Sequence, residues 1–552
     1  MSHLKKFLHQ LLKIKKEPTL LVLFIIFFIA LGLRFYQLDK SVWMQFGYDE
    51  SRDMLVASHI VDNHEFLSRG PLAAGGLNWL KNSPIYYYFV ALIWVFSGNP
   101  LTFMYLWALI MSTPILIGYL IGKKIKDKQT GLIIAIIFAI NHQMIASSRE
   151  LLQPHLLLLF ASAFIWSGLS FIKSKNHKLR YLILMIIFAL IPLHFHYGIL
   201  ISLPTIFLFI VYSWIILNKN DKKPSLKKIF TPIITLGGII TSWIILTYRI
   251  YPLDQFYFFI FNFEKNYNNP PLIQLQETIL TLNKMVWGDY FSNLGIIIFI
   301  ISFIVLISKI LTNKKREVIF KKMAAFLLFI SSSIFLFIFY KNFISETYLL
   351  FIFPFFLILL TLSFRLITER YKTFGTSLIV LVILIMTSFT LKRIFTKLPT
   401  TSYHDQQKEI AQEIYNHYQS LNIKTSSSQP KLLITWYTTN SGMPFDGWGT
   451  SGTWFYLEKL FKQSLIKNSS YGLNHAPLNK YPKIIYLICD HRMRTDLIQT
   501  ECLDRFTRSY PILNNKLEYL TNNLNISAWS AKVDPKNKNP IYNVVHKDLM
   551  SK

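Results

Sequence analysis

The stretch PTLLVLFIIFFIALGLRFYQL, residues 18–38, decides the fold class of this 552-residue chain. A bilayer core takes about 20 mostly apolar residues per helix, so this run is long enough to cross it. Five lysines precede it and no small-residue cleavage site follows. We therefore expect a retained anchor with a cytoplasmic N-terminus. Only 16% of the chain is charged, against about 25% in soluble domains.

Ten further apolar runs lie at 101–122, 130–147, 154–172, 180–194, 197–217, 229–250, 291–311, 323–340, 348–366 and 373–391. A shorter run at 84–97 is predicted to lie at the outer surface. With this assignment the inside loops, with the flanking Lys309, Arg180 and Arg365, hold 27 basic residues and the outside connections hold 9. The sequence therefore predicts a polytopic α-helical membrane protein of eleven spans, or about 11–13 if shorter segments also cross. The net charge of +29 then orients the chain, and we expect no nucleic acid partner.

The composition changes after Leu391. Residues 393–552 are polar and contain no further apolar run. Because an odd number of spans follows a cytoplasmic N-terminus, we expect this tail to lie outside the cell. Two helices and two buried strands are predicted within it, at 404–421, 454–463, 431–437 and 483–489. We divide the chain into a membrane domain, 1–392, with a large first outside loop at 39–100, and an extracytoplasmic soluble α/β domain, 393–552.

The first outside loop carries adjacent acids in the stretch FGYDESRD, residues 46–53. Acids near a membrane are costly to bury unless they are paired. They are therefore either a solvated loop pair or a functional pair. In the functional reading one of them is a general base, or both organise a phosphate or a metal ion at the water–lipid boundary.

Two later outside turns also present ionisable groups, Ser148-Arg149-Glu150 and His194-Phe195-His196. A transporter more typically places its ionisable residues near the midplane on broken helices. Their gathering at the outer rim therefore favours chemistry on a lipid-borne substrate. A transporter or flippase of lipid-linked sugars is the alternative, and a receptor or scaffold whose tail binds a partner is a third reading.

Several of these stretches resemble one known family. Asp49-Glu50-Ser51-Arg52 resembles the Asp-Glu-x-Arg motif of the GT-C glycosyltransferase superfamily, in the branch of protein O-mannosyltransferases and lipid A aminoarabinose transferases. SPIYYY, residues 83–88, resembles that branch's Pro-Pro-Leu-Tyr-Tyr-Trp element, with serine in place of the first proline. Residues 148–150 stand where the family has an arginine and an acid. Residues 348–354 resemble its late Arg-Tyr-Leu-Leu…Pro span, with Thr347 in place of the arginine.

The resemblance implies a GT-C-like membrane enzyme that transfers a sugar from a polyprenyl-phosphate carrier to a protein, lipid or glycan acceptor. The reaction is implied to occur on the outer face of the plasma membrane, with inversion at the anomeric carbon, and the carrier's tail is implied to lie in an apolar groove between spans. The charge pattern and the Lys/Ile/Asn-rich composition indicate a bacterial inner membrane.

The same resemblance implies roles for particular residues. Asp49 is expected to be the catalytic base and Glu50 to orient the acceptor. The residues expected to bind the donor phosphate or the acceptor are Arg52, Lys81, Tyr86, Arg149, Glu150, His194, His196 and Tyr197. No fixed cofactor is expected, and a divalent metal ion held by Glu50, Glu150, His194 and His196 is an open alternative.

Overall fold

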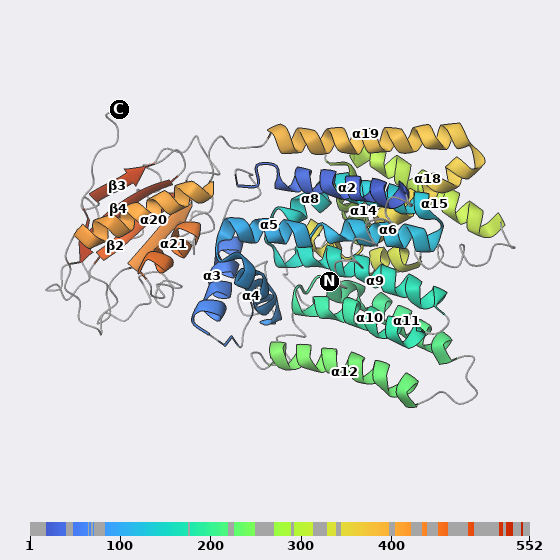
Figure 1. Cartoon of the computed structure of the whole chain (residues 1–552), viewed down its shortest axis with the longest axis horizontal. Helices are drawn as coiled ribbons and strands as arrows, with labels where there is room; N and C mark the ends of the chain where they lie inside the picture. The colour runs from blue at the N-terminus through green and yellow to red at the C-terminus, as the bar shows by residue number, and fades with distance from the viewer. Residues whose placement is uncertain are drawn as a thin grey trace, which may run out of the picture. The chain divides into compact units, whose positions relative to one another are not determined.

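The computed structural model describes residues 18–39, 48–64, 66–67, 70, 83–174, 177–218, 226–248, 270–288, 292–312, 328–337, 344–396, 403–420, 433–438, 451–461, 484–490, 518–522, 526–533 and 542–544. The chain divides into two compact units. The first unit is residues 1–36 with 60–396, and the second is residues 37–59 with 397–552. Each unit is described by itself, and Figure 1 draws the elements of both.

The first unit is a bundle of helices, and its longer members run in roughly the same direction (Figure 1). Its helices are α2 (Pro18–Phe35), α4 (Ile85–Ser97), α5 (Pro100–Ile110), α6 (Thr113–Ile125), α7 (Lys128–Ile140), α8 (His142–Ser148), η1 (Gln153–His155), α9 (Leu156–Lys173), α10 (Lys178–Leu190), η2 (Ile191–His194), α11 (Ile199–Asn218), α12 (Leu226–Tyr248), α14 (Pro271–Trp287), α15 (Ser292–Thr312), α17 (Glu346–Leu349), α18 (Phe353–Arg370) and α19 (Lys372–Thr396). A further apolar helix covers Leu328–Phe337.

Four helical stretches of the described chain are long and apolar enough to cross a membrane: Pro18–Phe35, Pro100–Ile125, Gln153–Lys173 and Lys372–Phe395. All four coincide with predicted runs. The run predicted as a single span at 130–147 is different, because α7 and α8 within it meet at an angle of 60°. The predicted total of eleven spans stays a prediction.

Sequence reasoning missed two helices. Helix α3 (Tyr48–Asp62) begins in the stretch treated above as loop, and α14 lies in a connection to which no element was assigned. Neither helix has an unbroken apolar run, so a search for spans does not detect them. Most of α3 belongs to the second unit, and α14 belongs to the first.

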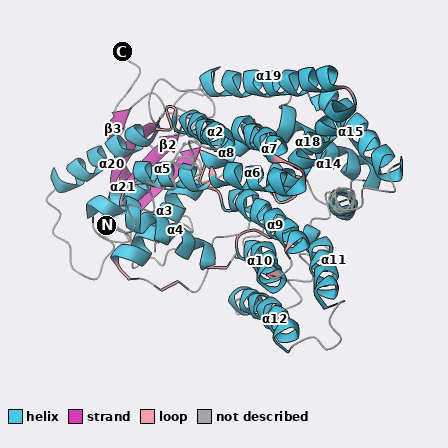
Figure 2. Ribbon diagram, turned by 45° about the vertical axis from the view of Figure 1, so that its right-hand side comes forward, coloured by secondary structure: helices cyan, strands magenta, loops and turns pink. Residues whose placement is uncertain are grey.

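The second unit contains all the strands of the described chain, drawn in magenta in Figure 2. They are β1 (Leu433–Thr438), β2 (Ile484–Asp490), β3 (Glu518–Asn522), β4 (Ile526–Val533) and β5 (Tyr542–Val544). The order is β1-β2-β4-β3, with β5 also paired to β4. Only β1 and β2 are parallel. Helices α20 (Tyr403–Ser420) and α21 (Ser451–Phe461) pack together, and α20 also contacts β3 and β4.

The turn between α6 and α7 is fixed by a carboxylate. Asp127 is the N-cap of α7, and its Oδ1 accepts hydrogen bonds from the Thr130 N–H at 2.7 Å and the Thr130 hydroxyl at 2.8 Å. Its Oδ2 pairs with Arg365 Nη2 at 3.1 Å. Burial opposes ionisation, but the bonds from Thr130 and the charge of Arg365 together lower the pKa of Asp127 below its usual value.

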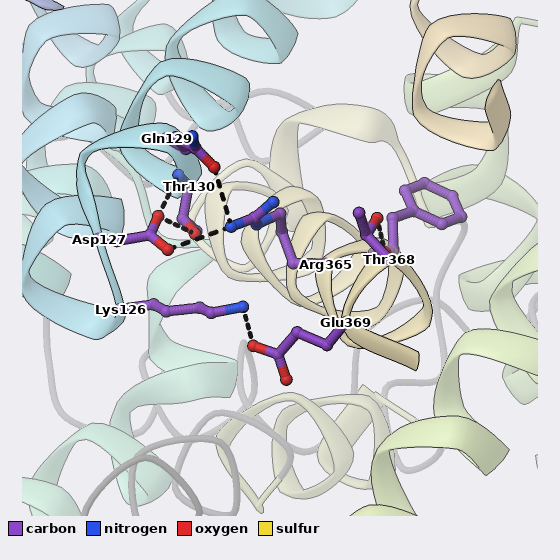
Figure 3. Close-up of polar contacts among 8 residues, drawn as sticks. Lys126, Asp127, Gln129, Thr130, Arg365, Thr368 and Glu369 are labelled. Atoms are coloured by element: carbon purple, nitrogen blue, oxygen red, sulfur yellow. Dashed lines mark hydrogen bonds and ion pairs between the residues drawn. The ribbon is translucent and has the colours of Figure 1, made fainter. Parts of the chain in front are cut away.

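Figure 3 shows how this cap is joined to the last turns of α18. Arg365 Nη2 also donates to Gln129 Oε1 at 3.4 Å, and Lys126 pairs with Glu369 one turn further along. Two ion pairs therefore tie the α6–α7 turn to the C-terminal end of α18. The predicted orientation places this network on the cytoplasmic side.

We expect Asp127→Ala to lower the stability of the folded protein by about 1 kcal/mol, because the helix loses its N-cap acceptor. Asp127→Asn keeps an acceptor for Thr130 and removes the charge that faces Arg365, so it should cost less, since half-exposed ion pairs contribute about 0–1 kcal/mol. Thermal unfolding in detergent measures both changes.

The same series has an expected pH dependence. The pKa of Asp127 is lowered on folding, so its charge contributes stability above the unfolded pKa and loses that contribution as the pH falls through the folded pKa. Wild type and the Asn variant should therefore converge in stability in acid. A difference that is independent of pH would show that the charge contributes nothing.

Candidate active site

The feature that organises the first unit is the break between α7 and α8 at Asn141. A helix that ends leaves its last carbonyl groups without intrahelical partners, and inside a membrane protein these must be bonded by other protein groups. Arg34 of α2 supplies two of the bonds: its Nη2 donates to the Phe138 carbonyl at 3.2 Å and its Nη1 donates to the Ala139 carbonyl at 3.0 Å. Arg34 is fully buried.

The other terminal carbonyls of α7 are bonded as well. The Asn141 N–H donates to the Ile137 carbonyl at 2.9 Å, and the Thr390 hydroxyl of α19 donates to the Ile140 carbonyl at 2.7 Å. Three helices thus meet at the end of α7. The bend is held by bonded polar groups, which explains why a run that looks continuous by hydropathy is not one straight helix.

The Asn141 side chain also bonds the ends of two other helices, the N-terminus of α8 and the C-terminus of α14. Its Oδ1 accepts from the Met144 N–H at 3.0 Å, which makes it the N-cap of α8. Its Nδ2 lies 3.1 Å from the Met285 carbonyl and 3.4 Å from the Val286 carbonyl, at the C-terminal end of α14. One buried side chain therefore serves both helix ends.

His142 adds a second bond to the same end of α14. Its Nε2 lies 2.8 Å from the Lys284 carbonyl, and its Nδ1 lies 2.9 Å from Arg393 Nη1 of α19. A guanidinium only donates, so Nδ1 is the acceptor and Nε2 carries the proton. The break thereby joins α2, α7, α8, α14 and α19.

Helix α8 leads into the predicted pair Arg149-Glu150. Arg149 is fully buried, and its Nη1 donates to the Leu33 carbonyl at the end of α2 at 3.1 Å. The Glu150 carbonyl accepts from Trp107 Nε1 at 3.1 Å and lies 3.0 Å from His155 Nδ1. The carboxylate of Glu150 is 34% exposed and lies 3.9 Å from His155 Nε2. Sequence reasoning missed His155.

The two predicted histidines have different surroundings. Ser83 Oγ, before α4, lies 2.9 Å from His194 Nδ1, and Ser242 Oγ of α12 lies 3.4 Å from His194 Nε2. Ser242 gives its own proton to the Ile239 carbonyl, so Nε2 donates and Nδ1 accepts from Ser83. His194 is therefore a neutral ring that connects α4, η2 and α12.

His196 lies beside Tyr348 of α17, with ring centroids 5.4 Å apart. Its Nδ1 accepts from the Gly198 N–H at 3.1 Å. Burial, and after it the nearby His155, lowers the pKa of His196 to about 4, so the ring is neutral at pH 7. Gly198 has no room for a side chain, because a Cβ there would lie 2.6 Å from a ring atom of Tyr348.

Tyr197, Gly198 and Tyr348 line part of an apolar cavity of about 460 Å³. It lies between α11 and α12, and its walls include Leu190, Leu200, Leu203, Phe207, Leu236 and Ile240. Its size is within the range of about 300–1,000 Å³ that is usual for ligand pockets. Tyr197 itself is buried and packs edge-on against Trp243 of α12.

In the second unit, Arg52 lies between two aspartates on α3. Its Nη1 pairs with Asp49 Oδ1 at 2.8 Å, and its Nη2 pairs with Asp53 Oδ1 at 2.7 Å. The Asp49 side chain is 38% exposed, whereas that of Asp53 is fully buried. Glu50 is buried as well. The structure thus gives Arg52 two carboxylate partners where the sequence predicted a phosphate ligand.

The predicted residues fall into groups. Arg149, Glu150, His194, His196, Tyr197 and Tyr86 lie in the first unit; Asp49, Glu50 and Arg52 lie in the second. Lys81 lies outside the described residues. Tyr86 is buried and packs against Tyr87 and Phe195, as an aromatic core residue does.

Two of the four possible metal ligands, His194 and His196, already use ring nitrogens in other hydrogen bonds. Both ring nitrogens of His194 contact serine hydroxyls, and Nδ1 of His196 accepts from a main-chain N–H. Within the described ranges no group of three or more His, Cys, Asp or Glu side chains is placed to hold a metal. We therefore derive no step through one.

The order and packing of these helices define the class of fold: the chain has the GT-C fold of membrane glycosyltransferases. Two solved structures of ArnT, the lipid A aminoarabinose transferase, from Cupriavidus metallidurans are similar to the chain. Its apo state matches with a TM-score of 0.57 at 11% identity, over 92% of this chain and 97% of that chain. Its complex with undecaprenyl phosphate gives 0.55 at 10% identity, over 93% and 97%.

A further match, to the Archaeoglobus fulgidus oligosaccharyltransferase tethered with an acceptor peptide, has a TM-score of 0.48 at 12% identity over 92% of this chain and 73% of that chain. No protein-family profile and no curated protein sequence matches the chain. The two ArnT matches confirm the predicted resemblance to the GT-C superfamily as a likeness of fold.

We expect Asn141→Ala to destabilise the first unit strongly. The change removes an N-cap, worth about 0.5–2 kcal/mol, and leaves buried carbonyls of α14 without their donor, at about 1–3 kcal/mol. The matched control is Asn99→Ala, because Asn99 caps α5 through the Thr102 N–H at 2.9 Å but is exposed. Thermal unfolding should show the larger loss for Asn141; equal losses would contradict the role of the break.

Proposed function

We propose that this protein is a membrane glycosyltransferase that transfers a sugar from a polyprenyl-phosphate carrier to an acceptor on the outer face of the plasma membrane. The observation that carries the proposal is the apolar cavity, which is lined by Tyr197, Gly198, Tyr348 and residues of α11 and α12. The GT-C fold supports the proposal, and one of its solved representatives is bound to undecaprenyl phosphate. The charge asymmetry of the loops supports the outer face.

In this proposal the isoprenoid tail occupies the cavity and the phosphate lies at its polar end. The Tyr348 ring lies beside the His196 ring there, tilted by 46°. Helix α17, which carries Tyr348, also packs against η1, which carries His155. His155 Nδ1 lies 3.0 Å from the Glu150 carbonyl, so packed elements connect this part of the cavity wall with the Arg149-Glu150 turn.

The reaction we propose is a direct displacement. The acceptor hydroxyl oxygen attacks the anomeric carbon, the bond from that carbon to the phosphate oxygen breaks, and the phosphate leaves with the electron pair, which inverts the configuration. Asp49 accepts the proton of the hydroxyl. It is the half-exposed acid of its group, and no described residue donates a hydrogen bond to its Oδ2. Glu50 orients the acceptor.

The broken helix also favours a second candidate, a transporter or flippase of lipid-linked sugars, because transporters use broken helices at their binding sites. There the unwound carbonyls bind the cargo or its coupling ion. At the break described above, side chains from neighbouring helices already bond the carbonyls of α7. We therefore rank this candidate second.

We also propose that residues 393–552 form an extracytoplasmic domain of the enzyme.

We expect Asp49→Asn to reduce sugar transfer by about 100-fold or more, the contribution typical of a general base. The measurement is release of labelled sugar from polyprenyl-phosphate sugars by purified protein in lipid. Asp62→Asn, an exposed acid at the other end of α3, is the control and should keep its activity. Transport of the donor that persists in both variants without any transfer would favour the flippase.

We expect Leu200→Trp to weaken the binding of long polyprenyl phosphates, because the indole would fill part of the cavity. A short-chain analogue that does not reach past the mouth should bind nearly as before. The control is Leu208→Trp on the same helix, where the side chain is 67% exposed and does not line the cavity. Equal binding of long chains by both variants would place the tail elsewhere.

A further inference from the structure

Arg52 makes an ion pair that helix geometry does not provide by default. Neighbouring residues of an α-helix point about 100° apart and do not face each other. Arg52 nevertheless reaches Asp53, the next residue of α3: its Nε donates to Asp53 Oδ1 at 2.8 Å, and its Nη2 lies 2.7 Å from the same oxygen. The Arg52 side chain therefore bends toward Asp53, with one edge of its guanidinium group on that carboxylate.

The Asp53 side chain is a well-fixed partner. It is 0% exposed, whereas the side chain of Arg52 is 16% exposed and that of Asp49 is 38% exposed. Removing one partner of a buried ion pair is strongly unfavourable, so the pair restrains both of its side chains. The three side chains thus run from a buried position to a half-exposed one, in the order Asp53, Arg52, Asp49.

The other edge of the same guanidinium group contacts the base proposed above. Arg52 Nη1 pairs with Asp49 Oδ1 at 2.8 Å, and no described residue donates a hydrogen bond to Asp49 Oδ2. An isolated surface ion pair holds its side chains weakly, because both lose rotamer freedom when they pair. Arg52 is already restrained by Asp53, so it can hold Asp49 more firmly than a freely rotating arginine would.

We propose that Asp53 is a positioning residue for sugar transfer: by fixing the guanidinium group of Arg52, it holds Asp49 in an orientation that leaves Oδ2 for the acceptor hydroxyl. Asp53 itself does not touch the substrate. A base oriented in advance reacts faster, since a misplacement of about 1 Å can reduce a rate about 100-fold. This rests on the proposed function, because it concerns the base of the same reaction.

The test measures the release of labelled sugar from undecaprenyl-phosphate sugars by the full-length protein in lipid, with Asp53→Ala made in two backgrounds. In the wild-type background we expect kcat to fall by about 10- to 100-fold, because Arg52 loses the partner that fixes it. In the Asp49→Asn background there is no base to position, so the same change should alter the residual transfer by no more than about twofold.

Ser58→Ala is the matched structural control. Ser58 is also 0% exposed on α3, and its Oγ donates to the Leu55 carbonyl at 2.8 Å. The change therefore removes a buried polar group from the same helix through a bond that does not involve Arg52, and kcat should stay at the wild-type value. Asp53→Asn keeps an oxygen that can accept from Arg52 Nε and should recover part of the transfer lost in Asp53→Ala.

An equal loss from Asp53→Ala in both backgrounds would overturn the proposal, because a purely structural role lowers transfer by the same factor whichever residue stands at position 49. No loss in the wild-type background would overturn it as well. A wild type that releases no sugar overturns the proposed function and this proposal with it. Equal transfer by wild type and Asp49→Asn overturns only the base and its positioning.

If Asp53→Ala does not fold, Arg52→Met combined with Asp53→Leu replaces the buried pair by apolar side chains, a change that is often neutral for stability. This double variant also leaves Asp49 without its restraint. It should therefore lower transfer in the wild-type background and have no further effect in the Asp49→Asn background, and an equal loss in both would again overturn the proposal.

Discussion

The structure depends on one constraint: a helix that breaks inside an apolar bundle must have its exposed carbonyl groups bonded by other parts of the chain. Every leftover carbonyl at the end of α7 is bonded, by Arg34, by the N–H of Asn141 and by Thr390. The Asn141 bond lies within the helix end itself, whereas Arg34 comes from α2 and Thr390 from α19, so the requirement of one helix end helps to determine where α2 and α19 pack. The break thus determines the direction of α8, and the Arg149-Glu150 turn follows directly after the last residue of α8.

Much of the fold could be predicted because hydropathy records which surfaces are buried in an apolar medium. The runs at 18–38 and 154–172 correspond to helices of nearly those bounds. The bend at Asn141 could not be read in this way, because it depends on partners more than 100 residues away in sequence, such as Met285. A polar residue between two apolar runs was its only local sign.

The site could be predicted in part, for a related reason. The position of ionisable residues near span ends led to the prediction of Arg149 and the histidines as site residues, but residue type does not tell which atoms are already bonded. His194 was a candidate metal ligand, and two serines from distant helices contact its ring nitrogens. Arg34 was passed over because it lies within an apolar run, although a charge inside a span is itself a sign of function.

The two ends of α7 are bonded by side chains of opposite charge, Asp127 at the N-terminus and Arg34 at the C-terminus. At its N-terminus the positive end of the helix dipole faces the carboxylate of Asp127, and the charge of Asp127 is also paired with that of Arg365. At its C-terminus the dipole faces the buried guanidinium of Arg34, which donates to the Phe138 and Ala139 carbonyls. One end of α7 is therefore held by a partly exposed carboxylate that is paired with a base, and the other end by a buried guanidinium that bonds main-chain carbonyls. Neutral groups complete the second end, since the Thr390 hydroxyl bonds the Ile140 carbonyl and Asn141 joins α7 to α14. This difference explains why the N-terminal end of α7 could be interpreted from local sequence, whereas the C-terminal end depends on three other helices.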